Sequence, residues 1–154
     1  MTDRKPPKLV DDERTTLHAL LQFQRESVLR KVDGIDDDAA RRQLVDSGTT
    51  LLWLVQHLAY AETLWIAHRF AGHPIDAPRT DTDLAAAIDT YRATWTRVDA
   101  IADRASLDDL CRDMDGDEQP VSLRWVLMHL LEETARHAGH ADILRELVDG
   151  TTGR

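Results

Sequence analysis

The sequence predicts an all-α protein folded as a four-helix bundle. Four segments, each of about 20 residues, repeat apolar side chains at the three- and four-residue spacing of an amphipathic helix. Stretches rich in Gly, Pro and Asp separate them. No segment shows the convincing alternation of a strand, and no internal repeat is present. Four such helices bury their apolar faces most simply in a bundle.

The first helix is expected over residues 11–33, after a short Pro-rich lead, with Gly34 as its stop. Its apolar positions are Leu17, Leu20, Leu21, Phe23, Val28 and Val32. Residues 36–47 read as a polar connection that contains a helical turn.

The second helix is expected over residues 49–71, with Ser47 and Thr49 as candidate N-caps. It should end near Gly72 and Pro74, where a turn-rich stretch begins.

The third helix is expected over residues 82–104, and the acidic segment 105–120, which ends in Pro, is expected to be a loop. Ser122 should cap the fourth helix, over residues 122–148. The connections are long enough to cross the bundle, so spacing alone leaves the order of helix directions open. Residues 1–154 are expected to form one domain.

Composition excludes several classes of function. The net charge of −9 argues against a nucleic-acid partner, which needs a basic face. No apolar run is long enough for a membrane span, and the first residues lack the apolar core of a signal peptide. The single cysteine fits a reducing compartment. We therefore expect a cytoplasmic protein without a membrane partner.

The fourth helix carries a carboxylate and several imidazoles on one face. Glu133 and His137 are one turn apart, and His140 and His129 share that side. Val126, Leu130, Leu144 and Val148 share it too, which predicts that this face is buried. Polar groups aimed at a core are costly unless compensated, and a divalent metal compensates this mixture best.

The second helix supplies a third candidate ligand, His57, in the middle of an apolar stripe. A lone histidine there is more often a core side chain hydrogen-bonded to a neighbour. However, His57, Glu133 and His137 all lie near the middle of their helices, so a bundle brings them within side-chain reach. Two imidazoles and one carboxylate, with a fourth position open, are typical of a catalytic zinc site. A di-iron centre is disfavoured because it needs a Glu-x-x-His motif on each of two helices.

The segments SGTTLLWLVQHLAYAETLWIAHRFAGHP and EETARHAGHADILRELVDG resemble the DinB-like superfamily of four-helix-bundle metalloproteins. Within it, the chain is most similar to the mycothiol S-transferase and maleylpyruvate isomerase type, over nearly its whole length. The resemblance maps the metal ligands to His57, Glu133 and His137. Many members carry three histidines, so Glu133 is a departure that resembles the mycothiol-dependent isomerase branch. His140 stands where other members often have glutamine.

The resemblance implies an up-down-down-up bundle, a single divalent ion, commonly zinc, and often a homodimer. It leads us to expect a thiol S-transferase that conjugates a low-molecular-weight thiol, mycothiol, to an electrophile in detoxification. His140 is the candidate catalytic base beside the ligands, with His129 as an alternative, although His140 could itself be a ligand. Nickel and manganese remain alternatives to zinc.

Two other functions stay open. The same ligands could serve a hydrolase or isomerase that uses bound water, or the chain could be a non-enzymatic helical binding module whose histidines only form hydrogen bonds. Recognition of a sugar-bearing thiol could involve Arg136, Asp142 and the loop 72–81, but a solvated helix face explains the first two more simply.

The remaining features suggest less. The four tryptophans are expected in core or interface packing, with a pocket-lining role open for Trp53. Cys111 has no base beside it in the sequence, and His18, His68 and His73 have no partner assigned by spacing. An acidic run lacks the full ligand set of a calcium loop, so we expect a solvated loop; it comprises Asp113, Asp115, Asp117 and Glu118.

Overall fold

A computed structural model describes residues 4–80, 83–114, 116 and 119–153. Its elements are α1 (Glu13–Val32), α2 (Asp37–Ala40), α3 (Leu51–Glu62), the π-helix η1 (Thr63–Phe70), α4 (Leu84–Ala102) and α5 (Leu123–Asp149). Over these residues no strand forms, apart from one isolated bridge between Leu110 and Ser122. The all-α prediction and the four predicted helices are therefore confirmed.

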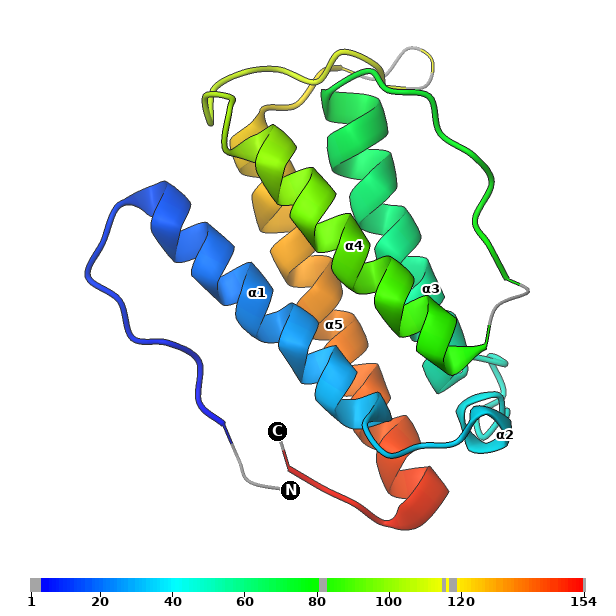
Figure 1. Ribbon diagram of the computed structural model, residues 1–154. Coiled ribbons are helices and arrows are strands. Elements are labelled where there is room, and N and C mark those ends of the chain that lie inside the picture. Colours follow the sequence, from blue (N-terminus) through cyan, green and yellow to red (C-terminus); the bar gives the residue numbers. More distant parts are fainter. Residues whose placement is uncertain (1–3, 81–82, 115, 117–118, 154) are drawn as a thin grey trace.

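The helices run in the up-down-down-up order that the resemblance implied. Figure 1 shows α1 and α5 running one way and α3 and α4 the other, with the connection after η1 returning along the bundle to the start of α4. Helix α5 packs against α1 and α3, and α4 packs against α3 and η1. None of the described helices is long and apolar enough to cross a membrane.

Side-chain caps fix where the long helices begin. Asp12, Thr50, Asp83 and Ser122 each accept a hydrogen bond from the backbone N–H three residues later. Ser122 was predicted for this role, but the prediction of Ser47 or Thr49 for α3 was wrong. Thr50 caps α3, while the Ser47 and Thr49 hydroxyls lie 3.0 Å from each other.

The second predicted helix ends as a π-helix, which the spacing of its apolar residues did not predict. Residues of η1 continue α3 without a break but with wider turns, and Gly72 (φ 74°) follows in the left-handed region. Such wide turns occur often at functional sites. Here they place Trp65 against α5, as described below.

A buried ion network joins three helices in the core. Arg25 of α1 donates to both Glu62 oxygens, at 2.9 and 2.7 Å, and to both Asp99 oxygens, at 2.9 Å each. Arg25 is 1% exposed and Glu62 is 0% exposed. The bidentate pairing on each side compensates the burial of these charges. The network therefore ties α1 to both α3 and α4.

Candidate metal centre

His57, Glu133 and His137 converge where α3 faces α5. One ligand atom from each side chain lies within 4.8 Å of the other two. The His57 Nε2–H donates to Glu133 Oε1 at 3.0 Å, and the His57 and His137 rings meet edge-on with centroids 4.7 Å apart. Because Glu133 and His137 are one turn apart on a single helix, α5 holds two of the three groups rigidly.

The protonation states of two of these groups suit a cation. The hydrogen bond from His57 lowers the pKa of Glu133 below its usual value, so this side chain is a carboxylate at neutral pH. Burial, together with the nearby His57, lowers the pKa of His137, which keeps its imidazole neutral. Neutral imidazole and carboxylate are the forms that bind a divalent metal.

The site also lacks one polar partner. His137 Nδ1 is buried without a hydrogen-bond partner among the described residues. A buried polar nitrogen in that state costs free energy, which a ligand in the site would recover. The donor set and this orphan nitrogen both fit a divalent ion.

The centre lies at the margin of the bundle. The predicted burial of its face of α5 is confirmed for Val126, Leu130 and Leu144, but the polar side chains of that face stay partly open to solvent. The His57 and Glu133 side chains are 27% and 18% exposed, and His140 is exposed. Burial continues from this face to a line about a quarter turn away; that line includes Leu123, Leu127, Thr134 and Ala141. The helical spacing was right, but the apolar stripe is broad enough that its edge stays open to solvent.

Aromatic rings flank the three candidate ligands on both sides. The Trp53 indole stacks on His57, with centroids 4.6 Å apart and planes 7° apart, although Trp53 itself is 43% exposed. On the other side, His129 Nε2 lies 3.4 Å from Glu133 Oε2, and its ring stacks on Trp125 and meets Trp65 edge-on. Trp53 and Trp125 are thus not core residues, whereas Trp65 and Trp95 are half-buried against the core.

His140 lies beside the three candidate ligands and is not one of the converging groups. Its ring centroid is 5.6 Å from that of His137. It lines a shallow pocket at the start of α3, together with Val45, Ser47, Thr49, Ile143 and Leu144. It is therefore close to the centre and open to solvent.

A family model for mycothiol-S-transferase matches residues 16–150. The chain belongs to the mycothiol-S-transferase family. A solved structure of a conserved protein from Enterococcus faecalis shares the fold, with a TM-score of 0.67 and 17% identity over 92% of this chain and 100% of that one. No curated protein matches the sequence.

Two of the side chains considered for recognition of a thiol, Arg136 and Asp142, form ion pairs with neighbouring residues instead. Arg136 is exposed and pairs with Glu132 at 3.3 Å. Asp142 pairs with the buried Lys31. The solvated-surface explanation fits Arg136, and Asp142 stabilises the α1–α5 packing. The loop 72–81, by contrast, does line a pocket, through residues 74–79.

The remaining predicted residues lie away from the centre. Burial raises the pKa of the Cys111 thiol, which disfavours the thiolate that a catalytic cysteine needs. His68 Nδ1 lies 2.8 Å from the His73 carbonyl oxygen, and His18 lies 3.9 Å from Asp103. In the acidic run, Asp115, Asp117 and Glu118 fall outside the described residues.

Sequence reasoning missed the supporting rings of the centre. Only Trp53 was linked to His57, one turn away, whereas the contact of Trp65 with Trp125 and His129 was not foreseen. Trp125, His129 and Glu133 follow one another at four-residue intervals on α5, and that spacing was the signal available.

Proposed function

We propose that this member of the mycothiol-S-transferase family is a divalent-metal-dependent transferase that joins mycothiol to an electrophile. The observation that carries the proposal is the convergence of His57, Glu133 and His137 within 4.8 Å, in a chain whose family is mycothiol-related. These three side chains would hold the ion, with zinc as the metal best suited to two imidazoles and one carboxylate.

When bound, the ion supplies a Lewis acid that lowers the pKa of a thiol toward neutrality. The protein's own residues do the rest. Trp53 stacks on the His57 imidazole and favours its present plane, and His129 Nε2 lies 3.4 Å from the second oxygen of Glu133. A ligand held in this way needs little ordering when the site is filled.

The exposed position of His140 suits it to accept the proton that the thiol releases. In the transfer, a carbon–sulfur bond forms between the thiol and the electrophilic carbon. If the electrophile carries a leaving group, the bond to that group breaks and its electrons leave with the group. If the electrophile is a strained ring or a double bond, the ring bond or the π bond breaks and its electrons stay on the substrate. In either case the atom that receives the electrons can take the proton back from His140. His129 is less suited to this role because it already contacts Glu133 and two indoles.

The test is mycothiol consumption with monochlorobimane as a thiol-reactive electrophile, in protein stripped of metal and then reloaded with zinc. We expect turnover only in the loaded protein, loss of turnover in Glu133→Gln, and retention in Glu132→Gln, an exposed neighbour. Turnover of an ester or isomerisable substrate without thiol would favour the hydrolase or isomerase alternative. Absence of any turnover, with unchanged stability after metal removal, would favour the binding module.

We also propose that the protein is a cytoplasmic homodimer. A thiol co-substrate and the buried free cysteine fit the reducing cytoplasm. Exposed apolar side chains on α5, namely Trp125, Met128, Ile143 and Leu147, suit the interface of a homodimer. Sedimentation velocity should then give a dimer, and a monomer at all accessible concentrations would contradict this part of the proposal.

A further inference from the structure

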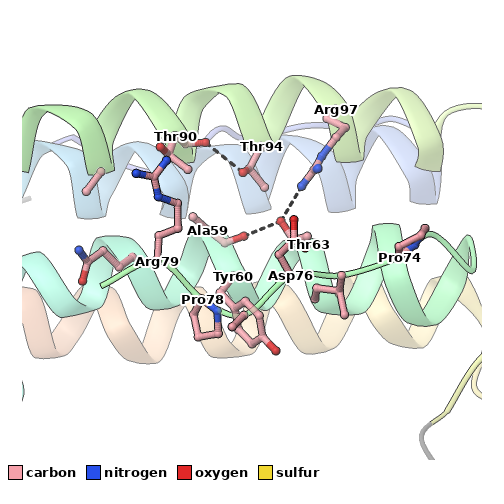
Figure 2. A pocket seen from close by; sticks show the side chains of 14 residues that line it. Ala59, Tyr60, Thr63, Pro74, Asp76, Pro78, Arg79, Thr90, Thr94 and Arg97 are labelled. Atoms are coloured by element: carbon pink, nitrogen blue, oxygen red, sulfur yellow. Dashed lines mark hydrogen bonds between the residues drawn. The ribbon is translucent and has the colours of Figure 1, made fainter. Parts of the chain in front are cut away.

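A second pocket lies on the other side of α3 from the metal centre. Residues of α3, η1 and α4 line it, and residues 74–79 of the connection between η1 and α4 complete its lining (Figure 2). Its volume is about 230 Å³, which leaves room for several water molecules or a small metabolite. The metal centre lies between α3 and α5, so the two sites are separate.

Two arginines and one aspartate are among the residues that line the pocket. Arg79 and Arg97 are its cationic residues and Asp76 is its one acidic residue, while the whole chain carries a net charge of −9. The Arg97 side chain reaches from α4 to Thr63, where Nη2 donates to the hydroxyl oxygen at 2.7 Å (Figure 2). That bond orients the exposed guanidinium, and among the described residues no ion pair joins Arg97 to a carboxylate. A guanidinium oriented in this way, with further N–H groups to donate, favours an anionic group.

The threonine hydroxyls in the pocket can offer only their lone pairs to a ligand. Thr63, Thr90 and Thr94 each donate to the carbonyl four residues earlier, at 2.9, 2.8 and 3.0 Å. A hydroxyl has one proton to donate and two lone pairs, so each oxygen remains an acceptor. Arg97 uses one lone pair of Thr63, whereas Thr90 and Thr94 keep theirs for a ligand. A ligand that satisfies them must bring hydrogen-bond donors.

We propose that this pocket binds a small polyhydroxylated acid, with the acidic group on Arg97 and the hydroxyl groups donating to Thr90, Thr94 and Asp76. A plain fatty acid would satisfy the arginine and leave the acceptors unpaired. An uncharged polyol would do the reverse. The requirement for both groups defines the ligand class.

Three probes with the same six-carbon chain separate these requirements: gluconate carries acid and hydroxyls, hexanoate only the acid, and sorbitol only hydroxyls. Protein-observed NMR titrations should show gluconate binding at the pocket at least about tenfold more tightly than either of the others. Arg97→Gln should reduce gluconate binding to the level of sorbitol. Thr90→Val, at an exposed position, should weaken gluconate binding and leave hexanoate unchanged.

Arg92→Gln is the matched control, because Arg92 is another exposed arginine of α4 that does not line this pocket. It should bind gluconate as the wild type does, and so should His57→Ala, which tests independence from the metal centre. Equal binding of hexanoate and gluconate, an equal effect of Arg97→Gln and Arg92→Gln, or no shift with any probe would overturn the proposal.

Discussion

Replacing Glu133 with glutamine should separate the role of this side chain as a metal ligand from its role in folding. Without metal, the variant loses the charge on the acceptor of the hydrogen bond from His57. Both side chains of this pair are partly exposed to solvent. That loss should lower the free energy of unfolding by about 1 kcal/mol. With zinc at a hundred times the dissociation constant, the wild type should gain about 2.7 kcal/mol. For a chain of this size that gain raises the melting temperature by about 5–11 °C.

The same zinc concentration should do little for the variant. Loss of one ligand should weaken zinc binding at least about a hundredfold. Zinc then raises the free energy of unfolding of the variant by at most about 0.4 kcal/mol. Far-UV circular dichroism during thermal unfolding, with and without zinc, measures both quantities. Glu132→Gln is the control, since Glu132 is 58% exposed and should keep the full shift. An equal zinc shift in Glu133→Gln and wild type would refute the ligand assignment.

Three further outcomes are expected. Arg25→Met should lower the free energy of unfolding, measured in urea, by about 3–5 kcal/mol, because it leaves buried Glu62 without its cation. The control Arg41→Met breaks an exposed ion pair and should cost under about 1 kcal/mol, and similar costs for the two variants would contradict this account. At neutral pH, Cys111 should react with Ellman's reagent at least about tenfold more slowly in the native protein than in the urea-unfolded protein, because burial raises the pKa of its thiol. Equal reaction rates would contradict the burial of Cys111. His140→Ala should keep the metal, as elemental analysis would show, and lower the thiol-transfer rate by about a hundredfold; loss of the ion would make His140 a ligand.

Local signals in the sequence were enough to predict the helices. Apolar spacing and turn residues gave each helix to within a few residues, because both act within one or two turns of chain. The choice of Thr50 as the cap, among neighbouring hydroxyl residues, depends on backbone geometry that spacing does not contain. The π-helix packs against α4 and α5, and apolar periodicity does not distinguish its wider turns from those of an α-helix.

The site was predictable as a set of residues but not as an environment. Helical spacing placed Glu133 and His137 on one face, and bundle geometry brought His57 toward them. How deep the centre lies, and which rings surround it, depend on how α3 and α5 are rotated against each other. The Arg25 network was missed for a related reason: Asp99 is 74 residues away from Arg25 in the sequence, and a charged residue on a helix is usually solvated.

Metal content measured by elemental mass spectrometry tests the central claim most directly. The protein is purified without a metal-affinity tag, incubated with zinc, desalted and compared with His57→Ala treated in the same way. The account predicts one ion per chain in the wild type and none in the variant, because the three side chains act together. No metal in the wild type, or equal metal in both proteins, would contradict a centre built from His57, Glu133 and His137.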